Sequence, residues 1–160
     1  MRRLIGRSTC AAALACWAGT VAAAPASADL RPPLVPSADG TAQVLVLHAR
    51  PCVLVEGEAD LVPLRARDTA DCTRLNRAMG PLRQEKLRRI RVKAGRYVIR
   101  VLNESVPWAL DFALEGAHDP SLPHTAGGRI EPGTGADFAL ELKPGVYVYR
   151  SPLNATLDYP

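Results

Sequence analysis

The second half of this chain alternates apolar and polar side chains with a period of two, and this pattern constrains the fold more than any other feature. In residues 88–103, "RRIRVKAGRYVIRVLN", Tyr97, Ile99 and Val101 all fall on one side. Because successive side chains of a β-strand point to opposite faces, such a segment predicts a half-buried strand. Three further segments show the same pattern: "WALDFALEG" (108–116), "DFALEL" (137–142) and "GVYVYR" (145–150).

Two shorter apolar runs precede this region. "AQVLVLHA" (42–49) favours a strand, and "PCVLVEGEADLVPL" (51–64) predicts a short strand, an acidic turn with glycine and a second apolar run. Pro63 indicates an edge position for that second run, because proline cannot donate to a central ladder. Short strands separated by turns rich in Gly and Pro are typical of an antiparallel sandwich or Greek-key barrel, so we predict an all-β fold.

One segment, 68–79 ("DTADCTRLNRAM"), has the character of a helix. Asp68 or Thr69 is placed to cap its first turn, and Gly80-Pro81 is predicted to end it. If its apolar face packs on the sheet, Cys72 points inward, toward the strands. The residues of that face are Cys72, Leu75 and Met79, three or four positions apart.

The N-terminal segment 1–28 has the pattern of a secretory signal peptide. Three arginines precede a short alanine-rich stretch that ends in Ala26-Ser27-Ala28, so cleavage is expected before Asp29. The apolar run is shorter than the roughly 20 residues that a membrane span needs. A competing interpretation is lipid attachment at Cys16. Either route places the protein in the periplasm or outside the cell, with no transmembrane segment after signal removal.

The charge of the predicted mature chain is close to neutral. Removing residues 1–28 takes away three arginines and no acids, so 20 basic and 16 acidic residues become 17 and 16. A nearly neutral chain gives no global electrostatic basis for binding nucleic acid. The remaining length corresponds to about one domain, with 29–40 as a Pro-rich leader and 41–160 as the folded part.

Only two cysteines, Cys52 and Cys72, remain after signal removal. In an oxidising compartment a disulfide between them is the simplest expectation. A metal or redox pair is the alternative, but their separation is far from C-x-x-C spacing. A loop of this size would stabilise the fold by roughly 3 kcal/mol.

The segments 92–114 and 127–152 together resemble the cupredoxin-like family. The resemblance covers about residues 89 to 159 and implies a Greek-key β-sandwich that often holds copper for electron transfer. Trp108 and Ser151 stand at positions where that family usually has a histidine and a cysteine ligand, so we do not expect a blue-copper centre. The matching residues are Gly95, Tyr97, Asn103, Pro107, Pro132-Gly133, Pro144-Gly145, Tyr147 and Tyr149.

Within this group, the chain is most similar to the cupredoxin-like modules of periplasmic iron-uptake proteins. Asp111, Glu131 and the loop 152–156 carry that likeness, which implies metal handling with copper or iron as cofactor. The long loop 116–135 adds two histidines, whose imidazoles suit Zn(II), Cu(II) or Fe. Solvated loop histidines without a shared partner are the alternative. The resulting candidate metal ligands are His118, His124, Asp111 and Glu131.

A basic strand is the candidate partner surface. Arg89, Arg91 and Lys93 would share one face and could dock an acidic envelope protein or an anionic surface. The alternative is a solvated face that protects a sheet edge. Catalysis has little support, because Gly-x-Ser-x-Gly is absent and no paired acids stand out. We therefore predict a non-enzymatic binding or accessory module, with a metal-uptake protein and a structural docking domain as alternatives.

Overall fold

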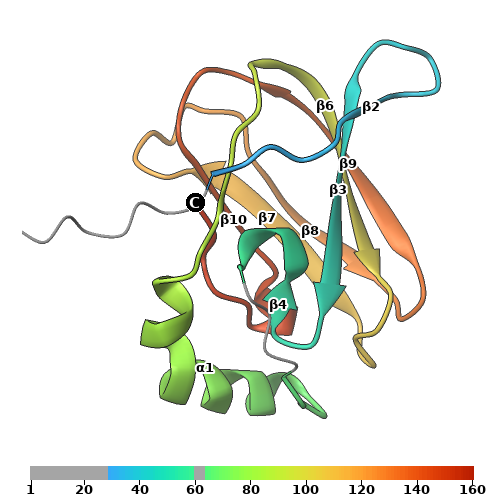
Figure 1. Ribbon diagram of the computed structural model, residues 1–160. Helices are drawn as coiled ribbons and strands as arrows, with labels where there is room; N and C mark the ends of the chain where they lie inside the picture. Colours follow the sequence, from blue (N-terminus) through green and yellow to red (C-terminus); the bar gives the residue numbers. More distant parts are fainter. Residues whose placement is uncertain (1–28, 60–63) are drawn as a thin grey trace, which may run out of the picture.

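The structure, a computed structural model, describes residues 29–59 and 64–160 (Figure 1). The predicted signal peptide and the run containing Pro63 lie outside the described residues, so both stay predictions. Across those two described ranges the chain is mostly β-sheet with one α-helix, as the alternating pattern predicts.

The larger sheet is built around two long central strands. Its order is β2-β3-β6-β9, and the short strand β4 pairs with β3 outside this order. Strands β3 and β6 run parallel, whereas β6 and β9 run antiparallel. The strands are β2 (Val35–Pro36), β3 (Gln43–Arg50), β4 (Val53–Leu54), β6 (Gly95–Asn103) and β9 (Gly135–Leu142).

The smaller sheet is antiparallel, with the order β10-β7-β8. It consists of β7 (Leu110–Gly116), β8 (Thr125–Ile130) and β10 (Tyr147–Arg150). Strand β8 corrects the prediction that 116–135 is a single long loop. Its sequence "TAGGRI" has no apolar alternation because four of its six residues are exposed, so its strand character comes from pairing with β7.

The segment predicted as a Pro-rich leader pairs with the rest of the chain. Strand β1 (Asp29–Leu30) runs parallel to β5 (Arg89–Ile90), and β2 forms the edge of the larger sheet. The backbone N–H of Arg91 donates to the Leu30 carbonyl at 3.0 Å, and the Arg91 guanidinium pairs with Asp29 at 2.6 Å. These long-range contacts, which prolines do not prevent at a sheet edge, place 29–40 within the folded unit.

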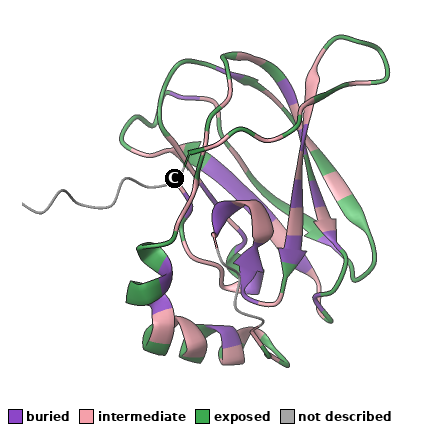
Figure 2. Cartoon of the chain, in the orientation of Figure 1, coloured by how far each residue is buried: buried purple, intermediate pink, exposed green. Residues whose placement is uncertain are grey.

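The two sheets pack face to face and bury the alternating apolar residues between them (Figure 2). Tyr97, Ile99 and Val101 of β6 are buried, as predicted. They meet Leu110, Phe112 and Leu114 of β7 in one hydrophobic core. A β-sandwich is thus confirmed, while Greek-key connectivity and the cupredoxin-like family stay predictions.

Helix α1 (Thr69–Gln84) lies at one end of the sandwich (Figure 1). Asp68, one of the two predicted caps, is the N-cap of the helix. Its side chain accepts a hydrogen bond from the Asp71 N–H at 2.8 Å. The predicted stop at Gly80-Pro81 is wrong, because the helix continues through Pro81 to Gln84. The last turn is held by a tertiary contact, because Arg83 in this turn is buried and forms an ion pair with Glu58. Among the described residues, no helix is long and apolar enough to cross a membrane.

Candidate functional site

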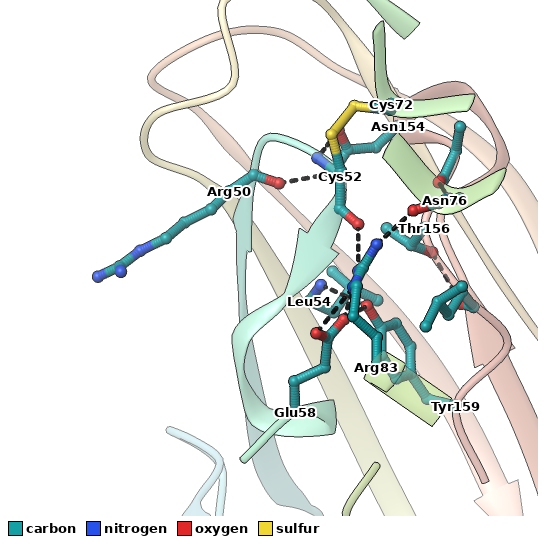
Figure 3. A network of polar contacts seen from close by, with 12 residues as sticks. Arg50, Cys52, Leu54, Glu58, Cys72, Asn76, Arg83, Asn154, Thr156 and Tyr159 are labelled. Atoms are coloured by element: carbon teal, nitrogen blue, oxygen red, sulfur yellow. Dashed lines mark hydrogen bonds and ion pairs between the residues drawn. A yellow bond between two sulfur atoms is a disulfide. The ribbon is translucent and has the colours of Figure 1, made fainter. Parts of the chain in front are cut away.

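A disulfide joins Cys52 to Cys72, as predicted, with 5.0 Å between their Cα atoms. It ties α1 to the turn after β3 (Figure 3). The side chain of Asn154 fixes the same turn from the C-terminal segment. Its Oδ1 accepts from the Cys52 N–H at 3.0 Å, and its Nδ2 donates to the Arg50 carbonyl at 2.8 Å.

Beside the disulfide, Arg83 and Glu58 form a buried ion pair (Figure 3). Arg83 also donates to the Cys52 carbonyl at 2.9 Å and to the side chain of Asn76. The Tyr159 hydroxyl donates to Glu58 at 2.8 Å and accepts from the Leu54 N–H at 3.1 Å. Burial, followed by the charge of Glu58, raises the pKa of Tyr159 well above its usual range. Since these polar groups satisfy one another, the network stabilises the fold and leaves no free group for a ligand.

The four predicted metal ligands do not gather at one site among the described residues. Asp111 accepts from the Leu153 N–H at 2.8 Å and lies 3.4 Å from the Ser151 hydroxyl. Glu131 pairs with Arg129 at 2.5 Å. His118 and His124 are exposed. Within 29–59 and 64–160, no three His, Cys, Asp or Glu side chains gather in a way that could hold a metal ion.

The two residues at the family's ligand positions have structural roles. Ser151 is fully buried, and its backbone N–H donates to the Thr156 hydroxyl at 2.9 Å. The Trp108 indole Nε1 donates to the Leu153 carbonyl at 3.2 Å. Both residues therefore anchor the loop that follows β10.

Between the two sheets lies a cleft of about 690 Å³. Its lining combines buried core residues from both sheets, which we call its floor, with exposed residues, which we call its rim. We call it the inter-sheet cleft. The main floor residues are Leu47, Ile99, Phe112, Leu114 and Tyr149.

All three residues of the predicted partner surface, Arg89, Arg91 and Lys93, line this cleft. With Lys143 from the turn before β10, they form what we call the basic rim. Neither Arg89 nor Lys93 has an ion-pair partner in the described part of the chain.

The other two rim cations have acidic neighbours. Arg91 pairs with Asp29 at 2.6 Å. Hydrogen bonds from Ser121 lower the pKa of Asp119, and the charge of Lys143 contributes to that shift. The unbalanced positive charge of the rim therefore centres on Arg89 and Lys93.

The sequence singled out the cations of 89–93, of which only Arg89–Ile90 form a strand (β5), and it missed the cleft that they line. Lys143 lies fifty residues beyond Lys93, and the floor combines strands from both sheets. No local sequence pattern indicates that residues so far apart in the chain lie in one cleft. The chain matches no protein-family model, no curated protein and no solved structure.

Proposed function

We propose that this protein is a non-catalytic, exported binding module that holds a small amphipathic organic anion in the inter-sheet cleft. The observation that carries the proposal is that the exposed cations of the basic rim and the buried apolar residues of the floor line the same cleft. The apolar part of the ligand would contact the floor, and its anionic end would lie at Arg89 and Lys93.

The physical properties of the cleft support this assignment. Its volume of about 690 Å³ lies within the range of roughly 300–1,000 Å³ that is usual for small-molecule sites. Such sites combine apolar walls with a few polar groups that orient the ligand. Arg89 and Lys93, which have no acidic partner among the described residues, also raise the local concentration of anions and speed their association.

Binding is favoured over catalysis because, within 29–59 and 64–160, Ser151 does not have the arrangement of an activated nucleophile. Ser151 is buried, and its hydroxyl donates to the Asp111 carboxylate at 3.4 Å. A serine nucleophile needs a hydrogen-bonded base, which is most often histidine. Ser151 has no such contact with a histidine in the described ranges.

The proposed location is the periplasm or the outside of the cell. The Cys52–Cys72 disulfide supports an oxidising compartment. The cupredoxin-like sandwich remains our proposal for the family, on the resemblance of 89–159. We do not favour the metal-uptake alternative with copper or iron, because its ligands Asp111 and Glu131 already have other partners.

The test is a titration of the purified protein with anilinonaphthalene sulfonate, an apolar dye with one negative charge. We expect saturable binding to one site that weakens with added salt. Replacing both unpaired cations, Arg89→Ala/Lys93→Ala, should weaken it about tenfold at low ionic strength. The matched control is Arg77→Ala, an exposed arginine of α1, which should leave the affinity unchanged.

Two results would reject the proposal. One is the absence of saturable dye binding to the folded protein. The other is equal affinity of the double variant and the Arg77→Ala control, because the dye would then bind away from the basic rim.

A further inference from the structure

A second hollow, of about 600 Å³, adjoins the inter-sheet cleft. Residues 91–94 line both, so the two hollows share Arg91 and Lys93. The described residues that line the second hollow include four cations and no Asp or Glu, and we call it the cationic hollow. The four cations are Arg31, Arg91, Lys93 and Arg96.

The charges of the cationic hollow are open to solvent and mostly unpaired. All four cations are exposed residues, so a ligand in solution can reach them. Arg91 pairs with Asp29 at 2.6 Å. Arg31, Lys93 and Arg96 have no ion-pair partner among the described residues.

Two acids stand beside the lining of this hollow without neutralising it. Glu141 is the cross-strand neighbour of Arg96 but forms no ion pair with it. Asp39 precedes Gly40 of the lining, and its carboxylate accepts hydrogen bonds from the hydroxyls of Ser37 and Thr41 in its own turn. The cations of the hollow therefore remain available to an anion.

Hydrogen bonds hold the segment that the two hollows share. The backbone N–H of Arg91 donates to the Leu30 carbonyl at 3.0 Å. The hydroxyl of the buried Tyr97 donates to the Lys93 carbonyl at 2.9 Å. Because this backbone is fixed before a ligand arrives, less ordering has to be paid for when an anion binds at Lys93.

We propose that the ligand is an amphiphile with a phosphate monoester head group, whose apolar chain lies in the inter-sheet cleft and whose phosphate lies at Lys93 in the cationic hollow. This inference rests on the proposed function of the cleft and names the class of anion that it holds. A phosphate monoester carries nearly two negative charges at neutral pH. Arginines are suited to phosphate oxygens, so Arg31 and Arg96 select this head group over a singly charged one.

The experiment compares decyl phosphate with decyl sulfate, which has the same chain and a tetrahedral head group of one negative charge. Both are titrated calorimetrically at about pH 8, where the phosphate is doubly charged, and below the concentration at which micelles form. Decyl phosphate should bind about tenfold more tightly at low ionic strength, because its second charge lies near the cations of the hollow.

The variant that tests the hollow is Arg31→Ala/Arg96→Ala, since these two residues line the cationic hollow and not the inter-sheet cleft. It should lose most of the preference for decyl phosphate and keep its affinity for decyl sulfate within about threefold. The matched control is Arg65→Ala/Arg77→Ala, which removes two exposed arginines that line neither hollow and should keep the preference.

A titration with inorganic phosphate separates a lipid head group from the free ion. Inorganic phosphate should not bind measurably at concentrations that saturate the protein with decyl phosphate, because it lacks the chain that contacts the apolar floor. If the two bind equally tightly, the hollow takes free phosphate, and the inference of a phosphorylated amphiphile is overturned.

The possible failures can be told apart. If decyl sulfate and the dye bind through Arg89 and Lys93 but decyl phosphate is not preferred, the assigned head group is wrong and the proposed function stands. The same conclusion follows if Arg31→Ala/Arg96→Ala keeps the preference. If none of the three amphiphiles binds, the proposed function is wrong and the inference fails with it.

Discussion

Arg83 and Glu58 meet inside the molecule as an ion pair with two hydrogen bonds. Arg83 Nε donates to Oε2 at 3.1 Å, and Nη2 donates to Oε1 at 2.5 Å. The two side chains are only 8% and 7% exposed. Because α1 carries Arg83 and the segment after η1 (Val55–Gly57) carries Glu58, the pair joins the helix to the sandwich.

Removing the charge of Glu58 should strongly destabilise the protein. Glu58→Gln keeps the shape of the side chain but leaves the Arg83 charge buried without its partner, at a cost of about 3–5 kcal/mol. Urea unfolding would measure the loss. The control is Asp137→Asn, which breaks the exposed pair with Arg100 and should cost no more than about 1 kcal/mol at neutral pH. Similar losses for both variants would contradict this account.

Removing the disulfide should lower the free energy of unfolding by about 3 kcal/mol, since the unfolded chain regains the entropy of an open loop. The Cys52→Ser/Cys72→Ser variant and the reduced original protein should unfold at similar urea concentrations. An unchanged midpoint for the reduced protein would show that α1 is held without the covalent link.

Ala155 is expected to be a site where glycine improves stability. It caps η2 (Pro152–Asn154) in a left-handed conformation, with φ of 44° and ψ of 46°. Such a conformation costs a residue with a Cβ roughly 1–2 kcal/mol, whereas glycine adopts it readily. After the greater flexibility of unfolded glycine is subtracted, Ala155→Gly should stabilise by about 0.5 kcal/mol. In contrast, Ala70→Gly within α1 should destabilise by up to about 1 kcal/mol, and unfolding of both variants tests the difference.

Asp137 should contribute a pH-dependent part of the stability. Two hydrogen bonds from Arg100, both 2.7 Å, lower its pKa below the ordinary value of 3.8. The unfolded chain then binds more protons at acidic pH, so this contribution is complete above about pH 4 and is lost as the pH falls through the lowered pKa. Unfolding measured between pH 5 and pH 2 should show a shallower pH dependence for Asp137→Asn. Parallel curves for the two proteins would contradict the prediction.

The affinity of the inter-sheet cleft for straight-chain carboxylates should depend on chain length. Each methylene that enters the apolar floor contributes about 0.8 kcal/mol, or roughly fourfold in affinity. The gain should stop when the cleft is full. Calorimetry from hexanoate to hexadecanoate would measure the series, and an affinity independent of length would place these ligands outside the cleft.

Several features could be predicted because they are local. The alternation of Tyr97, Ile99 and Val101 reports which side of β6 is buried, and the Asp68 cap marks the start of α1. The disulfide followed from the presence of only two cysteines after the predicted signal peptide. Each of these signals comes from short-range geometry or from residue chemistry, which a single sequence contains.

Other features depend on residues that meet only after folding. Strand β8 has no apolar period because it is mostly exposed, so pairing with β7 determines its conformation. The end of α1 depends on Arg83 reaching Glu58, and the edge strands β1 and β2 depend on β5 and β3.

The sequence by itself determined the class of fold, the covalent link and the cluster of cations in 89–93, because periodicity, cysteine number and charge are properties of the chain. Only the tertiary structure decided which residues these cations lie beside. It brings Arg89 and Lys93 to the same cleft as the buried apolar floor residues. The physical reason is that a cleft belongs to the packing of two sheets, and its residues come from segments that are distant in the sequence.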